Sequence, residues 1–345
     1  MGSRSVLMNI PYSRKYQKMK DERIIICLYV DDLIIASDSM SSLKSFKDLM
    51  KREFEMTDMG TLHYFLGMEV TFNNGNITLS QNQYAKALLD KFNMTNCTAL
   101  STPMEYGLRL SKQDMDDEVD SNLYRRLVGS LMYLTNTRPD LMFAVNKISQ
   151  FMEQPKRSHW EAGKRILRYV KGTLNQGLVY SKGGKGTLTG FSDNDYAGNI
   201  DDSKSTSGYV FQLGTGTVAW QSKKQKVVAL SSTEAEYIAL SMAGCQALWL
   251  QGILEELQEG AKGPIVIHCD NKSTISRAKD PGFHGKSKHI RIKYHFIRDL
   301  IKNNDVEVRF CPTGSQIADI LTKALQLKVF NHLKNQLQIW DAHTE

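Results

Sequence analysis

The hydrophobic positions near the start of the chain form two short continuous runs, as in buried β-strands. Residues 24–30 and 33–36 are aliphatic or β-branched runs on either side of Asp31 and Asp32, so they predict a hairpin with an acidic tip. Residues 41–54 then repeat apolar side chains at helical spacing. This part of the chain is therefore predicted to combine strands with at least one helix.

The next hundred residues change from strand to helix patterns. Asn74 and Gly75, inside TFNNGNITL, are a strong turn signal and predict a second hairpin. A helix is predicted over residues 81–91, and the polar, acidic stretch 93–122 is the best candidate for a linker. Three amphipathic helices are predicted after it, over residues 124–134, 138–152 and 159–172.

Beyond the Gly- and Lys-rich segment around residue 183, strand patterns return. Strands are predicted over residues 188–191, 208–213, 218–221, 265–269 and 306–311. A long helix is predicted over residues 232–257, further helical segments between the fourth strand and residue 303, and a final helix from residue 316. The order β-β-β-α-β-α-β-α predicts an α/β domain with a mixed five-stranded sheet and flanking helices.

Composition limits the class of protein without identifying it. The 345 residues contain 44 Lys+Arg against 37 Asp+Glu, a net charge of +7 that favours an anionic partner. Five cysteines without a CxxC pair indicate reduced thiols in an intracellular protein. The N-terminal sequence lacks the apolar core of a secretory signal, and no uncharged apolar run is long enough to predict a membrane span.

Two aspartates come at the ends of predicted strands in the last domain. Asp193 (LTGFSDND) is placed directly after the first strand and Asp270 (IVIHCDN) directly after the fourth. Side chains there are held by the sheet yet remain open to solvent, so two such carboxylates can converge on a cation. Taken singly, each is more often a helix cap or a turn residue.

Three further acids lie on predicted helices. Ser231 and Glu234 have the spacing of a capping box, which gives Glu234 a structural role. Glu236 shares a helix face with small residues that allow close packing on a sheet, where a buried carboxylate needs a compensating partner. Asp319 lies in the first turn of the last predicted helix, where favourable interaction with the helix dipole is a sufficient explanation.

Taken together, the four acids and their flanking words resemble a known family. The segments GFSDNDYAG, STSGYVF, ALSSTEAEY, HCDNKST and QIADILTK are similar to the RNase H domain of Ty1/copia-type retrotransposon Pol proteins. The resemblance implies an RNase H-like fold and hydrolysis of the RNA strand of RNA/DNA hybrids by two Mg²⁺ ions, with Mn²⁺ as an alternative. It implies that Asp193, Glu236, Asp270 and Asp319 are catalytic metal ligands, with Asp195 in reserve.

One departure from the family accompanies this resemblance. Many RNases H carry a histidine in the loop before the last carboxylate, and the matching stretch here, CPTGSQIAD, has none. A group that assists proton transfer is therefore absent from this position, and slow turnover is expected.

Basic residues near these acids predict contacts with nucleic acid. The segment from residue 272 to 302 is strongly basic, and residues 159–172 add a second group of cations. The candidate binding residues are Lys272, Lys286, Lys288, Arg291, Arg165 and Arg168. The alternative is an ordinary solvated helix face.

The acidic hairpin carries a second resemblance. YVDD, at residues 29–32, resembles the polymerase motif of reverse transcriptases, and MGTLHYFLGMEV and YRRLVGSLMYLTNTRPDL are similar to copia-type polymerases. The resemblance implies a metal-binding role for Asp31 and Asp32. No convincing third palm aspartate is seen, so polymerase activity is expected to be absent from this chain.

The combined expectation is a Pol fragment with four segments. These are a partial α+β reverse-transcriptase palm (1–92), a helical thumb or connection region (93–182), an RNase H domain (183–330) and a C-terminal tail (331–345). Expected partners are RNA/DNA hybrids, other nucleic acid and other Pol or Gag products, with no membrane; the expected location is cytoplasmic, within virus-like particles, or nuclear. The alternatives are a catalytically inactive nucleic-acid-binding remnant and an intact reverse transcriptase.

Overall fold

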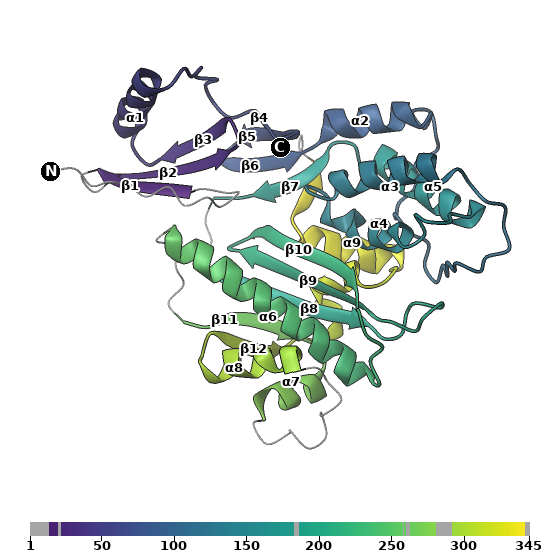
Figure 1. The fold of residues 1–345 in the computed structure, drawn as a ribbon. Coiled ribbons are helices and arrows are strands. Elements are labelled where there is room, and N and C mark those ends of the chain that lie inside the picture. The colour runs from purple at the N-terminus through teal and green to yellow at the C-terminus, as the bar shows by residue number, and fades with distance from the viewer. Residues whose placement is uncertain are drawn as a thin grey trace. The chain divides into compact units, whose positions relative to one another are not determined.

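The computed structural model describes residues 14–19, 22–182, 186–257, 259, 263–280 and 292–341. Contacts between Cα atoms divide the chain into two compact units, with the main boundary between His63 and Tyr64. Figure 1 follows the chain through both. The boundaries expected near residues 92 and 182 remain predictions.

The first unit is a three-stranded antiparallel sheet with one helix. Its strands are β1 (Arg14–Met19), β2 (Glu22–Tyr29) and β3 (Asp32–Ser37), in the order β1-β2-β3, followed by α1 (Met40–Glu53). Ile24, Ile26 and Phe46 form its small core. The expected acidic hairpin is present, whereas β1 was not predicted because RKYQKM lacks a hydrophobic alternation.

The second unit contains an antiparallel sheet in the order β13-β7-β6-β5-β4. Its strands are β4 (Tyr64–Phe65), β5 (Met68–Asn73), β6 (Asn76–Ser80), β7 (Gln176–Tyr180) and β13 (Ile339–Asp341). The predicted turn is confirmed, since Asn74 and Gly75 have φ angles of 47° and 81°, which suit a tight hairpin. Strand β7 was missed.

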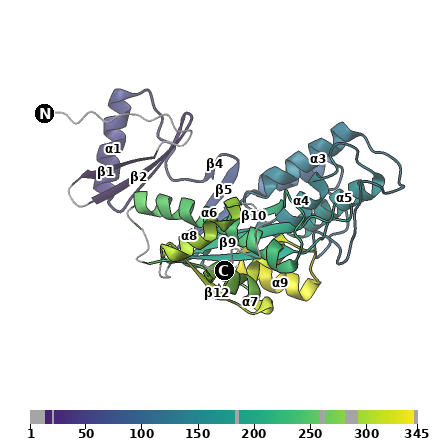
Figure 2. The ribbon, with the colours of Figure 1, turned by 60° about the horizontal axis from the view of Figure 1, so that its bottom comes forward.

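Helices pack beside this sheet. They are α2 (Asn82–Lys91), α3 (Ser121–Leu134), the 3₁₀ helix η1 (Pro139–Leu141), α4 (Met142–Ser149) and α5 (Arg157–Gly172). Figure 2 shows α3, α4 and α5 grouped on one flank of the unit. The stretch predicted to be a linker is packed, because Met104 and Leu110 are buried in the core of these helices and Asp120 caps α3.

The predicted mixed five-stranded sheet is confirmed, in the order β10-β9-β8-β11-β12. Strands β8 (Leu188–Asp195), β9 (Thr206–Leu213) and β10 (Gly216–Lys224) are antiparallel, while β11 (Ile265–Cys269) and β12 (Val306–Phe310) run parallel to β8. Helices α6 (Ser232–Glu256), α7 (Lys272–Lys279), η2 (Ile292–His295) and α8 (Phe296–Lys302) follow the predicted pattern. Figure 1 shows α6 lying across this sheet.

Helix α6 is long and apolar enough to cross a membrane by length and composition alone. In the structure it is a core helix: 56% of its most apolar window is buried, and Tyr237, Leu240 and Ala243 pack into the core shared with β9 and β11. Its apolar character is therefore explained by packing on the sheet.

The segment after β12 differs from the single helix predicted from residue 316. It forms two short 3₁₀ helices, η3 (Thr313–Ser315) and η4 (Ile317–Leu321), then α9 (Leu327–Gln336). The Gln316 side chain accepts a hydrogen bond from the Ala318 amide and donates one to the carbonyl of Ser192 in β8. These bonds fix the tighter helix against the sheet. Of the residues expected to be a tail, 331–336 lie in α9 and 339–341 form β13.

Candidate active site

Asp193 and Asp270 come from neighbouring parallel strands. Asp193 is 2% exposed and lies inside β8, which continues to Asp195, so its placement after the strand end was wrong by two residues. Asp270 follows β11 directly, as predicted, and accepts a hydrogen bond of 2.8 Å from the Thr313 hydroxyl. The central strands of the sheet therefore bring both carboxylates to one place.

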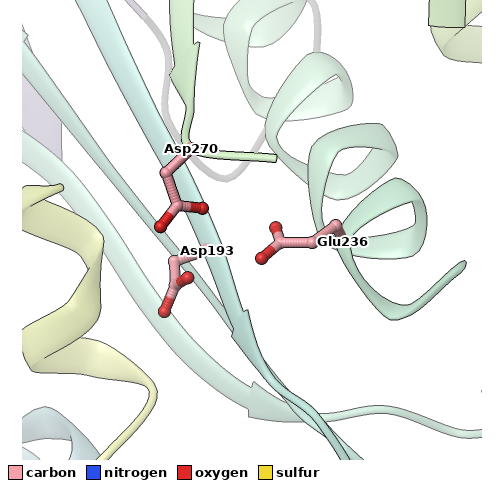
Figure 3. A group of neighbouring side chains, drawn as sticks. All are labelled: Asp193, Glu236 and Asp270. Atoms are coloured by element: carbon pink, nitrogen blue, oxygen red, sulfur yellow. The ribbon is translucent and has the colours of Figure 1, made fainter. Parts of the chain in front are cut away.

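Glu236 reaches the same place from the second turn of α6. Oxygen atoms of Asp193, Glu236 and Asp270 all lie within 4.8 Å of one another. Figure 3 shows the three side chains gathered at one place, with Asp270 at the end of its strand and Glu236 reaching toward the two aspartates from the helix. The Oε2 atom of Glu236 is buried and has no hydrogen-bond partner, which is costly for a carboxylate oxygen unless a cation or proton compensates it.

Glu234, two residues earlier, serves the helix end. The Ser231 hydroxyl accepts a hydrogen bond from the Glu234 amide at 3.1 Å, and the Glu234 carboxylate accepts one from the Leu230 amide at 2.9 Å. The glutamate thus accepts a hydrogen bond from the amide of the residue before Ser231. The two glutamates therefore have different surroundings: Glu234 at the helix end and Glu236 in the carboxylate cluster.

Asp319, the fourth predicted ligand, lies on the other side of Asp193. It is 4% exposed in η4, and its Oδ1 atom is 3.0 Å from the ammonium of Lys323. The same ammonium is 3.7 Å from Oδ2 of Asp193, which also accepts a hydrogen bond from the Thr322 hydroxyl. Thr322 and Lys323 were missed, although the i,i+4 spacing of Asp319 and Lys323 is a recognisable ion-pair signal.

Burial and mutual repulsion shift the protonation of the cluster. Burial and the neighbouring Asp319 raise the pKa of Asp193 well above its usual value. Burial and the charge of Asp270 raise the pKa of Glu236 to about 8. Burial raises the pKa of Asp319, although Lys323 opposes this. The site is therefore short of positive charge and suited to a cation.

Asp195, the reserve ligand, has another partner. It accepts a hydrogen bond from the Thr206 amide on the neighbouring strand, and burial raises its pKa to about 6. Among the described residues, the group of acids able to hold a metal ion comprises Asp193, Glu236 and Asp270, without Asp195.

This donor set fits a hard divalent cation. The three ligating groups are carboxylates, which suit ions that prefer oxygen ligands. The buried, unpartnered Oε2 of Glu236 supplies the independent indication, because a bound cation would satisfy it. The residues present therefore agree with a metal at this site.

The predicted nucleic-acid contacts have different surroundings. Lys272 is exposed, with its ammonium 4.8 Å from the centroid of the Phe310 ring. In contrast, Arg168 donates a hydrogen bond of 2.8 Å to the carbonyl of Thr98, and Arg165 donates one of 3.1 Å to the Thr102 hydroxyl. The structure thus gives both arginines local partners. The other three candidates, Lys286, Lys288 and Arg291, lie outside the described residues.

The acidic hairpin of the first unit is exposed. Val30 and Asp31 form its turn, and Asp32 pairs with Tyr29 across the hairpin. Val30 is 76% exposed and has a φ angle of 51°, unusual for a β-branched residue and of the kind found at functional turns. In the described part of the chain, no third carboxylate joins the two aspartates in a metal-type cluster.

Comparisons with known proteins agree with the resemblance to copia-type Pol proteins. Residues 11–106 match the family model described as reverse transcriptase (RNA-dependent DNA polymerase). The Retrovirus-related Pol polyprotein from transposon RE2 of Arabidopsis thaliana is 39% identical over 92% of this chain, which covers 22% of that protein. The putative transposon Ty5-1 protein of Saccharomyces cerevisiae is 33% identical over 66% of the chain, which covers 74% of that protein. RNase H1 from the archaeon Halobacterium salinarum matches at 19% identity over 40% of this chain and 95% of its own, with a TM-score of 0.29.

The family model shows a fold of the polymerase type in residues 11–106, and the mixed sheet further along the chain carries a buried cluster of carboxylates. The chain belongs to the Pol polyproteins of Ty1/copia-type LTR retrotransposons. It spans about a fifth of the length of the RE2 polyprotein.

Proposed function

We propose that the second unit cleaves the RNA strand of RNA/DNA hybrids in a Mg²⁺-dependent reaction. The observation that carries this proposal is the convergence of Asp193, Glu236 and Asp270 within 4.8 Å, with a buried oxygen of Glu236 left unpartnered. Membership of the Pol family supports a nucleic-acid substrate.

Each residue then has a definite task. Asp193, Glu236 and Asp270 hold the cation, and Asp319 contributes to a second one. Bound Mg²⁺ supplies activation of the attacking water and stabilisation of the leaving oxygen. The Thr322 hydroxyl fixes one oxygen of Asp193, while the Thr313 hydroxyl fixes one oxygen of Asp270, so both carboxylates are oriented before substrate arrives. No histidine lies between residues 311 and 319 to accept a proton.

The substrate is a polyanion, and exposed cations near the cluster favour its binding. Lys272 follows Asp270 by two residues, and its ammonium lies beside the half-exposed ring of Phe310. A lysine and an aromatic ring together suit a phosphate and the adjoining sugar or base. We therefore assign Lys272 to substrate binding, with Lys286, Lys288 and Arg291 as further candidates.

Cleavage of a labelled hybrid by the purified protein, with Mg²⁺ and with EDTA, tests the proposal. Glu236→Gln is expected to abolish cleavage, and Glu234→Gln on the same helix is the matched control, since Glu234 serves the helix end. Equal cleavage by Glu236→Gln and the unaltered protein would refute the site. Salt-sensitive hybrid binding without cleavage in Mg²⁺ or Mn²⁺ would instead support an inactive nucleic-acid-binding remnant.

For the first unit we propose that Asp31 and Asp32 do not support DNA synthesis in this chain. The support is that both are exposed and that the described residues bring no third carboxylate to them. Template-directed incorporation of deoxynucleotides by the purified protein would overturn this.

A further inference from the structure

A lysine ammonium lies between two carboxylates of the candidate site. Nζ of Lys323 is 3.0 Å from Oδ1 of Asp319 and 3.7 Å from Oδ2 of Asp193. Asp193 is therefore shared: on one side it meets Glu236 and Asp270, and on the other it meets this ion pair. We call the Asp193–Asp319 side, where the ammonium lies, the occupied side of the site. The side formed by Asp193, Glu236 and Asp270 is the open side.

The two sides differ in what a divalent cation would find there. On the open side, Oε2 of Glu236 is buried without a partner and no described lysine or arginine pairs with Glu236 or Asp270. On the occupied side, an arriving cation would be repelled by the ammonium at close range. The open side is thus prepared for a metal ion, whereas the other side already contains a tethered cation.

Lys323 is also able to leave. Its side chain is 39% exposed, while those of Asp193 and Asp319 are 2% and 6% exposed. A lysine has a flexible four-carbon stem and a strongly hydrated head, so it can turn toward solvent or toward an incoming phosphate. The carboxylates are fixed by burial, whereas the ammonium of the half-exposed lysine is held by its ion pairs with Asp193 and Asp319.

We infer that Lys323 is a positioning residue that neutralises the Asp193–Asp319 side of the site and makes metal binding sequential. The first divalent cation binds at Asp193, Glu236 and Asp270. A second binds only weakly until the phosphate of the substrate draws the lysine away. This inference rests on the metal site of the proposed function and adds an order of binding to it.

Binding of Mn²⁺ to the purified protein without nucleic acid, followed by electron paramagnetic resonance of the free ion, tests the order. The unaltered protein is expected to show one strong site. Lys323→Met keeps an unbranched side chain, shorter by one atom, and removes the charge, so it is expected to strengthen a second site by about tenfold or more. Lys272→Met removes a charge near Asp270 that pairs with no site carboxylate in the structure, and is expected to leave the second site weak.

The outcomes separate this inference from the proposed function. Two equally strong sites in the unaltered protein, or an unchanged second site in Lys323→Met, would overturn the sequential order while leaving the nuclease proposal intact. No Mn²⁺ binding by the unaltered protein would overturn both. Lys323→Arg keeps the charge and is expected to behave like the unaltered protein. Retention of the first strong Mn²⁺ site in Lys323→Met shows that this variant is folded.

Discussion

Gly208 lies directly opposite Asp193 in the β8–β9 ladder. A Cβ atom at Gly208 would come within 2.8 Å of Cγ2 of Thr322 and 2.9 Å of Cβ of Leu321. The missing side chain therefore allows η4 to approach the sheet closely enough for the Thr322 hydroxyl to reach Asp193. One glycine thus determines how the two halves of the acidic site meet.

Gly208→Ala is expected to push η4 outward, because Leu321 and the backbone of Ala318 cannot move independently of the helix. Overpacking of this kind costs about 1–3 kcal/mol of unfolding free energy. The rate of hybrid cleavage per folded molecule should also fall. Urea unfolding of the same preparation gives the folded fraction and the free energy of unfolding. Gly190→Ala is the control. Its added Cβ would clash with the Phe211 ring, in the core between the sheet and α6, so the free energy of unfolding should fall while cleavage per folded molecule stays unchanged. Equal activity losses in both variants would contradict this account.

Neutralising a buried ligand is expected to separate activity from stability. Asp193→Asn should lower hybrid cleavage by at least about 100-fold, since even partners outside the ligand shell typically contribute tenfold to 100-fold. In EDTA the same variant should be more stable than the unaltered protein, because burial and repulsion by Asp319 disfavour the charged carboxylate. Cleavage and thermal unfolding measured on one preparation check both statements, and lower stability in EDTA would contradict the second.

The metal-free protein is expected to lose stability as pH rises. The pKa of Glu236 is raised from 4.5 to about 8, so between these values the folded state keeps a proton that the unfolded state has released. The free energy of unfolding therefore decreases with pH across this window and levels off above it. The melting temperature in EDTA should fall between about pH 5 and about pH 9, and Mg²⁺ should restore it most at the alkaline end. Glu236→Gln should make the profile shallower, with the remaining slope coming from Asp193 and Asp319.

A buried ion pair supports the helices next to the site. Arg138 donates hydrogen bonds of 2.9 and 2.7 Å to Asp140, whose Oδ2 atom also accepts one of 2.6 Å from the Tyr169 hydroxyl. Asp140→Asn leaves the guanidinium buried without its counter-charge, which typically costs about 3–5 kcal/mol. Urea unfolding measures this. The exposed Asp117→Asn should change the value by less than about 0.5 kcal/mol, and a similarly small effect at Asp140 would contradict the prediction.

Nucleic-acid binding should distinguish Lys272 from Arg168. Lys272→Gln is expected to weaken hybrid binding and to reduce the slope of log affinity against log salt by about 1, as for loss of one phosphate contact. Arg168→Gln should leave that slope unchanged and cost about 1–2 kcal/mol of stability, because it removes a charged hydrogen bond to Thr98. A changed salt slope in Arg168→Gln would restore the binding role suggested by the sequence.

The sequence predicted the site residues that are marked by a pattern in the residues next to them. Asp270 follows a strongly apolar strand, and Glu236 lies on a helix with clear small-residue and capping patterns. The sequence could not show that Gln316 and Thr322 hold the segment around Asp319 as a 3₁₀ helix, because their partners, Ser192 and Asp193, are more than a hundred residues away. Strand β7 was missed for a similar reason: QGLVY is short, and it is stabilised by pairing with β6 and β13.

The pairing of β13 with β7 has a consequence for how the protein is made. The chain leaves the antiparallel sheet at Tyr180 and rejoins it at Ile339, so the carboxylate-bearing sheet is an insertion between two neighbouring strands. During translation Asp193 emerges long before Lys323, and its negative charge has no counter-charge from η4 in the meantime. Contacts so distant in sequence form slowly. The carboxylate cluster around Asp193 is therefore expected to gain the counter-charge of Lys323 only after η4 has been synthesised.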